Sequence, residues 1–381
     1  MHSLNKSTVE KYDFIDLARA LAILGVIAVH SYQKIEDLPY ILSAISNYGQ
    51  LGVQLFFIAS AYTLCLSMEN RNEISISYFY LRRFFRIAPL FYFGIVFYYL
   101  WSVFKINTLG LTSEISYSYL YVIENILFIH GFNPENFNNI VPGGWSISVE
   151  MTFYLLFPLL YRLYKLIGQE KFLAYSALLI TTGICIQYSI YNELTPLSLS
   201  SNITNDGFSF IYASFFNMYG VFLIGMIFYF YRDKPLASGS MVLALVLIAT
   251  SALMQNLQQF NTTIDGAIYP ILSSIAFGIF IIRISKIKNI NFWGKNFLIE
   301  IGKKSYSIYL LHFFTLDIIR ELLIKVDANP SLLLFLTFSL TILLTTFFAT
   351  LTMKYIEKPF IDTGSKIINS IKRNRALINF K

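Results

Sequence analysis

The sequence has few charged residues, since Asp, Glu, Lys and Arg together make up 13% of its 381 residues, whereas 56% are hydrophobic. A water-soluble domain of this length carries about a quarter of its residues as charges. This scarcity of charge excludes an ordinary soluble fold and indicates a chain embedded in a lipid bilayer, which is the first partner that we expect.

Other absences limit the kinds of bond and reaction that we expect. The chain has only two cysteines, Cys65 and Cys185, each inside an apolar run, so we expect packing roles and no disulfide. No HExxH spacing, no GxSxG elbow and no glycine-rich phosphate loop is present, so we predict no metal site and no covalent serine or cysteine chemistry. The net charge of +7 reflects membrane orientation in such a chain, and we predict no nucleic-acid partner.

The apolar runs predict an all-α, polytopic integral membrane protein with about ten transmembrane helices. The run at 118–130 is too short to cross, and it predicts a re-entrant or interfacial helix. No linker divides the chain, so we expect one transmembrane domain over residues 1–360 and a basic tail over 361–381. The ten predicted spans are 14–32, 49–67, 87–105, 146–164, 171–190, 210–231, 238–256, 267–284, 305–325 and 332–353.

The distribution of positive charge sets the predicted orientation. If 118–130 does not cross, the connections on one side hold almost all of the 29 Lys and Arg residues, and the other side holds only Lys34, Lys105 and Lys325. Positively charged connections stay in the cytoplasm, so we predict that both termini and the tail are cytoplasmic.

The first predicted span, 14–32, carries three ionisable residues, Asp16, Arg19 and His30. Arg19 and His30 are eleven positions apart, which on a helix gives directions within about 20° and a rise of about 16 Å. A charge in mid-membrane costs about 3 kcal/mol, so this stripe predicts a cavity with Arg19 toward the cytoplasm and His30 near the outer face. A salt bridge at the rim with an interfacial histidine is the alternative.

Three arginines, Arg82, Arg83 and Arg86, precede the third span and share one side of a helix. Guanidinium groups hold phosphate through paired hydrogen bonds, although a basic cluster at this depth also anchors a protein to anionic lipid heads. Glu150 lies about one turn inside the fourth span, and we predict that it bonds His30 and leaves the other ring nitrogen able to take a proton from a hydroxyl. The alternative is a protonated Glu150 satisfied by a nearby serine.

A third polar group lies at the start of the ninth span, where Ser305, Tyr309 and His312 share one helical face and could line the same cavity. A structural role for His312 is the alternative. Farther along this span, Asp317 and Arg320 are three positions apart and predict a local ion pair.

Six segments in order along the chain carry a family resemblance: FIDLARALAILGVIAVH (14–30), GVQLFFIASAY (52–62), LRRFFRIAPLFY (81–92), WSISVEMTFYLLFPLL (145–160), SYSIYLLH (305–312) and YIEKPF (355–360). They resemble the membrane acyltransferase 3 family, multi-pass bacterial inner-membrane enzymes that O-acylate carbohydrates. The resemblance implies acyl-CoA, most often acetyl-CoA, as the donor and a hydroxyl of a surface glycan as the acceptor.

The resemblance also implies roles for the polar residues. Arg82, Arg83 and Arg86, helped by Arg19, would hold the phosphates of acyl-CoA, and the pantetheine arm would bridge the distance to His30. His30 would act as general base or carry the acetyl group briefly, with Glu150 orienting it. Asp16 and Arg19 complete the catalytic group. The residues expected to line the substrate cavity are Trp145, Ser148, Ser305, Tyr309 and His312.

Two other functions remain open at this point. Buried ionisable residues in a helical membrane protein also suit a proton-coupled transporter, although the two halves of the chain show no convincing repeat. A non-catalytic scaffold for glycan assembly would tolerate exchange of His30 and of the three arginines. A homo-oligomer is neither indicated nor excluded by the sequence.

Overall fold

The computed structural model describes residues 13–71, 75–109, 118–200, 206–256, 263–287 and 290–379. Within these ranges every regular element is a helix, which confirms the all-α prediction. Residues 1–12 of the predicted domain and 380–381 of the predicted tail lie outside the described residues. The division at residue 360 stays a prediction.

The helices of the first half of the chain are α2 (Asp13–Tyr32), α3 (Tyr40–Asn47), η1 (Tyr48–Leu51), α4 (Gly52–Arg71), α5 (Ile76–Leu109), α6 (Tyr119–Ile126), η2 (His130–Phe132), α7 (Gly144–Ile167) and α8 (Gln169–Ser200). Those of the second half are α9 (Asp206–Ala213), α10 (Phe215–Phe230), α11 (Ser240–Asn256), α12 (Thr263–Ser285), α13 (Lys295–Lys303), α14 (Ser305–Leu323), α15 (Pro330–Thr352), the π-turn η3 (Met353–Glu357) and α16 (Lys358–Asn379). Each of the ten predicted spans is largely helical, but 210–231 is divided between α9 and α10 at Ser214, and 49–67 begins in η1 before it continues as α4.

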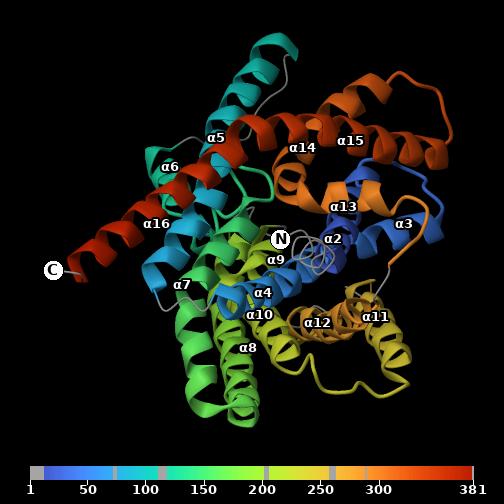
Figure 1. Ribbon diagram of the computed structural model, residues 1–381. Helices are drawn as coiled ribbons and strands as arrows, with labels where there is room; N and C mark the ends of the chain where they lie inside the picture. The colour runs from blue at the N-terminus through green and yellow to red at the C-terminus, as the bar shows by residue number, and fades with distance from the viewer. Residues whose placement is uncertain are drawn as a thin grey trace.

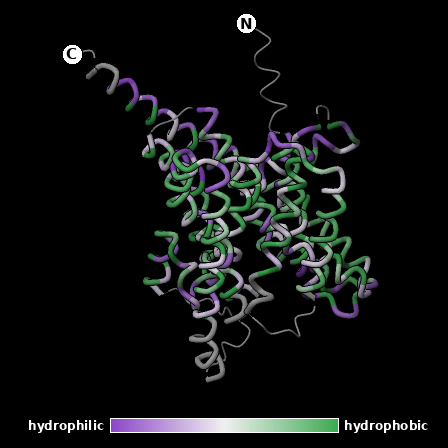
Figure 2. The backbone as a smooth tube through the Cα atoms, turned by 90° about the horizontal axis from the view of Figure 1, so that it is seen from below, coloured by the Kyte–Doolittle hydropathy of each residue, from purple (hydrophilic) through white to green (hydrophobic). Residues whose placement is uncertain are grey.

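The protein is a multi-pass membrane protein. Figure 2 shows hydrophobic residues through the middle of the helical bundle and hydrophilic stretches gathered toward its upper and lower edges. The number of ten crossings and the cytoplasmic position of both termini stay predictions. Among the described residues, 7 helical stretches are long and apolar enough to cross a bilayer: Asp13–Tyr32, Tyr40–Arg71, Ile76–Thr108, Gln169–Ile190, Phe210–Phe230, Ile268–Ser285 and Pro330–Asn374.

The ambiguous run at 118–130 contains the short helix α6 of 8 residues. At 1.5 Å per residue this helix is about 12 Å long, less than half of the apolar thickness of a bilayer. Its apolar side chains include Tyr119, Leu120 and Ile123, and all three are exposed. The run thus forms a short helix, and its not crossing the bilayer stays a prediction.

Helices α2 and α4 lie near the middle of the bundle in Figure 1, with α13, α14 and α15 on one side and α10, α11 and α12 on the other. Ala18 and Ala22 of α2 are fully buried, as are Ala59 and Ala61 of α4. Small side chains let two helices approach closely in a membrane, where lipid offers no hydrophobic drive to pack them. This packing fixes the position of the polar stripe on α2.

Helix α13 is an element that the sequence did not predict, because its basic residues read as a cytoplasmic connection. Gly302 packs against the backbone of α2, since a Cβ atom added there would lie 1.8 Å from the carbonyl oxygen of Asp16. Lys295 forms an ion pair with Asp13 at 2.9 Å. Within α13, a hydrogen bond of 3.0 Å from Lys303 lowers the pKa of Glu300.

Helix α16 begins directly after η3 and projects away from the bundle in Figure 1. Its first half packs against α5, where a Cβ atom added at Gly364 would lie 2.8 Å from Phe85. The predicted basic tail is thus helical over its described residues.

Candidate active site

A cavity of about 80 Å³ lies among α2, α4, α5, α7 and α14. It brings together six of the residues predicted from sequence: Arg19, Arg83, Arg86, Glu150, Ser305 and Tyr309. These residues come from four helices spread over most of the chain. The polar stripe on the first span predicts one cavity with both Arg19 and His30; Arg19 lines this cavity, whereas His30 and His312 are not among its lining residues.

Helix α2 contributes Arg19, whose side chain is 18% exposed and forms an ion pair of 3.8 Å with Asp16. The guanidinium also donates to the Thr63 hydroxyl on α4, at 3.3 Å. The ion pair is the one that the alternative reading of this helix proposed. Because Arg19 also lines the cavity, the pair holds a cation at the site instead of only anchoring the rim.

Two of the three clustered arginines reach the cavity. Arg83 lies over the rings of Phe79 and Tyr154 at 5.6 and 5.7 Å, and its buried Nε has no hydrogen-bond partner among the described atoms. Arg86 is exposed while it lines the cavity, so it marks the mouth. Arg82 is half-buried and is not among the residues that line the cavity.

Glu150 does not have the partner predicted for it. Its Oε1 accepts hydrogen bonds from the hydroxyls of Ser60 and Tyr154, both at 2.5 Å. The physical reason is depth: Glu150 lies within electrostatic range of Arg19 and Arg83, at the arginine end of the site. The predicted bond between Glu150 and the imidazole at the other end is therefore wrong, and so is the alternative of a neighbouring serine on α7.

His30 lies at the other end of α2 and faces α14, not lipid. Its ring centroid is 5.4 Å from that of His312 and 4.5 Å from that of Phe313. Its Nδ1 is 3.0 Å from the amide oxygen of Gln33, which can only accept, so Nδ1 carries the hydrogen and Nε2 keeps a lone pair. Arg320 donates to the backbone carbonyl of His30.

The last contact corrects a further prediction. Arg320 and Asp317 do not pair in the structure, because Asp317 accepts from Lys105 of α5 at 2.9 Å and from Trp101 at 3.3 Å. Arg320 instead satisfies a carbonyl in the last turn of α2, where a helix end carries partial negative charge. Arg320 thereby ties His30 to α14.

Tyr309 lies between the cavity and the histidines. Its hydroxyl accepts from Ser146 at 2.8 Å and donates to the carbonyl of Gly143 at 3.0 Å. Gly143 has φ of 76°, a left-handed conformation that favours glycine, and an added Cβ would lie 3.1 Å from the Tyr309 hydroxyl. The start of α7 is thus fixed against α14, and His312 lies one turn beyond Tyr309.

Trp145 and Ser148 do not line the cavity, contrary to prediction, because they lie on other faces of α7 than Ser146 and Glu150. The Trp145 ring packs edge-on against aromatic rings of α4 and α9, with centroids at 6.4 and 5.8 Å. Ser148 donates to the Phe128 carbonyl at 2.6 Å and accepts from the backbone of the η2 segment at 3.1 Å. Both residues therefore shape the fold around the site.

Several polar residues of the site were not predicted. Ser60 and Tyr154 hold Glu150, and the spacing of four positions between Glu150 and Tyr154 was the available signal. Glu357 is 5% exposed in the π-turn η3 and accepts from Ser307 of α14. Its segment contributed to the family resemblance, and π-turns inside helices are frequent near functional sites.

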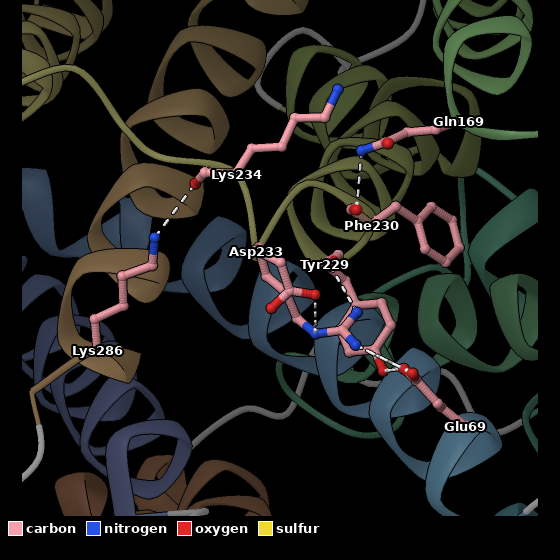
Figure 3. Close-up of polar contacts among 8 residues, drawn as sticks. Glu69, Gln169, Tyr229, Phe230, Asp233, Lys234 and Lys286 are labelled. Carbon is pink, nitrogen blue, oxygen red and sulfur yellow. Dashed lines mark hydrogen bonds and ion pairs between the residues drawn. The ribbon is translucent and has the colours of Figure 1, made fainter.

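A second cavity, of about 640 Å³, lies at the ends of α2, α4, α10, α12 and α13. Figure 3 shows its polar contacts around Glu69 and Asp233. Arg232 pairs with Glu69 at 2.9 Å and with Asp233 at 3.8 Å. Arg232 and Lys295 are paired with carboxylates and Lys286 donates to the carbonyl of Lys234, so this cavity offers less to a phosphate than the arginines of the first cavity do.

Comparisons with known proteins give the family of the chain. Residues 12–353 match the family described as an acyltransferase domain. A Staphylococcus aureus (strain COL) protein provisionally named an O-acetyltransferase is 25% identical over 392 residues, covering 93% of this chain and 58% of that protein. The chain thus spans about 58% of the length of such relatives.

Two further relatives match parts of the chain. Peptidoglycan O-acetyltransferase OatA of Listeria monocytogenes serovar 1/2a is 29% identical over 157 residues, covering 38% of this chain and 23% of that protein. Acyltransferase MdmB of Streptomyces mycarofaciens is 28% identical over 178 residues, covering 45% and 44% respectively. No solved structure matches the chain. The family match extends over most of the sequence, so the protein belongs to this acyltransferase family, as its motifs predict.

Proposed function

We propose that the protein transfers an acetyl or other acyl group from cytoplasmic acyl-CoA to a hydroxyl of a surface carbohydrate on the outer face of a bacterial inner membrane. The observation that carries the proposal is the arrangement along α2, where Arg19 enters a cavity shared with Arg83 and Arg86 and His30 meets α14 about 16 Å farther along. The names of the relatives support O-acetylation.

The donor is held at the arginine end. Arg86 is exposed at the mouth of the cavity and Arg83 has an unpartnered Nε, so both have hydrogen-bonding capacity for phosphate oxygens. Two further arginines extend this cationic surface. Arg19 lines the cavity, and Arg82 lies outside its lining. A cavity of about 80 Å³ takes a thioester and the end of a pantetheine arm, so the nucleotide binds at the mouth.

In this proposal Glu150 and Asp16 balance the positive charge of the arginines. Asp16 pairs with Arg19, and Glu150 places one negative charge between Arg19 and Arg83. Like charges that are close together repel, so these carboxylates stabilise the cluster while the donor is absent. Glu150 thereby takes a role at the donor end instead of orienting His30.

The acyl group must pass Tyr309 to reach His30. Tyr309 lines the cavity, is held by hydrogen bonds to Ser146 and Gly143, and lies one turn before His312. In this proposal, rotation of the phenol about its side-chain bonds opens a path to His30 without moving a helix. Donor and acceptor then enter from opposite faces of the membrane and meet beside His30.

The chemical step uses the lone pair on His30 Nε2. The acceptor oxygen attacks the thioester carbonyl carbon, a C–O bond forms, and the C–S bond breaks. The hydroxyl proton passes to His30 Nε2 and then to the departing thiolate of CoA. General-base help of this kind contributes about 10² to 10⁴ in rate, and alignment of the two substrates supplies much of the rest. The alternative to this direct transfer is a transient acetylation of His30 Nε2.

Sealed vesicles test the proposal and its competitors. Inside-out vesicles that contain the protein receive labelled acetyl-CoA outside and chitotetraose inside, and ester on the trapped sugar is measured. We expect ester only when the two substrates are on opposite faces. Sugar movement driven by a pH gradient without acetyl-CoA consumption would favour the transporter. If neither ester formation nor sugar transport is found, and replacing His30 changes neither result, the non-catalytic scaffold is favoured.

A further inference from the structure

His312 is held in one tautomer by its own helix. The side chain is 0% exposed on α14, and its Nδ1 lies 2.6 Å from the carbonyl oxygen of Tyr309. A carbonyl oxygen can only accept a hydrogen bond, so Nδ1 carries the hydrogen and Nε2 keeps its lone pair. The ring therefore presents a hydrogen-bond acceptor at Nε2.

This acceptor has no partner in the described part of the chain, although it is fully buried. Buried polar atoms are nearly always hydrogen-bonded, so an exception beside a proposed reaction site is a candidate contact for a bound group. His130 also has an unpartnered ring nitrogen, so burial alone does not mark a ligand. His312 differs because its ring lies against His30, the base of the proposed reaction.

The two rings are arranged side by side. Their centroids are 5.4 Å apart with an angle of 34° between the planes, and both rings contact Phe313. Gln33 accepts from Nδ1 of His30, so each imidazole has its hydrogen on Nδ1 and a lone pair on Nε2. A hydroxyl has one hydrogen, so it donates to only one of the two rings at a time, and a ligand that bonds both lone pairs needs two donors.

We propose that His312 Nε2 accepts a hydrogen bond from a second hydroxyl of the acceptor, next to the hydroxyl that His30 deprotonates. The proposal rests on the function proposed above and adds that the site selects acceptors with neighbouring hydroxyls, such as sugars, over simple alcohols. His312 is thus a specificity-determining residue, and the proton of the second hydroxyl stays on its oxygen.

Two substitutions separate hydrogen bonding from packing. His312→Asn keeps a donor near the position of Nδ1 and removes the acceptor at Nε2, whereas His312→Gln places an amide oxygen near the position of Nε2. With chitotetraose as acceptor, His312→Asn should raise the acceptor KM roughly tenfold and leave the KM for acetyl-CoA unchanged. His312→Gln should restore part of the loss. His130→Asn is the matched control, because it alters a buried histidine away from His30, and its acceptor KM should not change.

A ratio of inhibition constants gives a result that does not depend on the folded fraction. Trans-cyclohexane-1,2-diol and cyclohexanol are compared as inhibitors of transfer to chitotetraose. For the unmodified protein the diol should bind roughly tenfold more tightly than the mono-alcohol, and His312→Asn should abolish this preference. An equal ratio in the two proteins, or no preference in the unmodified one, would overturn the assignment of His312 alone. Failure of the unmodified protein to form any ester would instead refute the proposed function.

Discussion

Replacing Glu150 by Gln tests which end of the site this carboxylate serves. In the structure its Oε1 accepts from Ser60 and Tyr154 at 2.5 Å, while His30 bonds Gln33. Glutamine has the same shape and retains an acceptor oxygen, but it has no charge. Glu150→Gln should therefore weaken the fold around α7 without altering the base.

The magnitude follows from the two hydrogen bonds. A bond to a charged acceptor contributes about 1.5 to 3 kcal/mol and a neutral one about 0.5 to 1.5, so two bonds lose about 2 kcal/mol in total. No hydrogen bond joins Glu150 to Arg19 or Arg83 among the described contacts, so both guanidinium groups keep their positions. Loss of a neighbouring negative charge should leave the KM for acetyl-CoA equal or lower, by less than about tenfold.

The assay combines thermal unfolding with kinetics. We expect a lower unfolding temperature, an unchanged pH dependence of kcat between about pH 5 and 9, and no increase in the KM for acetyl-CoA. Tyr154→Phe is the control, because it removes one of the same bonds and keeps the charge. A displaced pH dependence of kcat in Glu150→Gln, with normal stability, would mean that Glu150 acts on His30 and would refute this reasoning.

Three further predictions concern the arginines, the η2 segment and the helix contact beneath the site. Arg83→Ala and Arg86→Ala should each raise the KM for acetyl-CoA more than they lower kcat. Arg82→Ala should raise this KM less, because Arg82 lies outside the cavity lining. The same KM for acetyl-CoA in all three variants would count against phosphate binding by these arginines. Ser148→Ala should destabilise the protein by about 1 to 3 kcal/mol, measured by thermal unfolding, with both KM values unchanged. Gly302→Ala places a methyl group 1.8 Å from a carbonyl oxygen of α2, so little folded protein should be recovered by size-exclusion chromatography, and normal recovery would contradict the close approach.

The helices were predictable because their signal is long and local. Each apolar run gives a helix from composition alone, and the short run at 118–130 was recognisable by its length. The stripe on α2 was predictable because Arg19 and His30 belong to one helix with fixed geometry. The gathering of Arg83 and Arg86 beside Arg19 also agrees with the sequence.

Contacts between helices were not predictable in the same way. Glu150 and His30 were paired by an estimate of depth, and a shift of one helical turn moves a side chain by about 5.4 Å, enough to exchange one partner for another. The tertiary fold gave Glu150 the hydroxyl of Ser60 instead. Arg320 similarly bonds a carbonyl of α2, a contact between residues 290 positions apart that no local spacing reports. Partners of buried polar residues therefore required the structure.

Acyl transfer by sealed vesicles that contain His30→Ala tests the central claim most directly. The variant is compared with the unmodified protein at equal amounts in the membrane, with acetyl-CoA on the cytoplasmic face and chitotetraose on the other. Loss of ester by a factor of about 10² or more, with the KM for acetyl-CoA unchanged in any residual activity, is the result that we predict. Transfer at the unmodified rate by His30→Ala would contradict the assignment of His30 as the base.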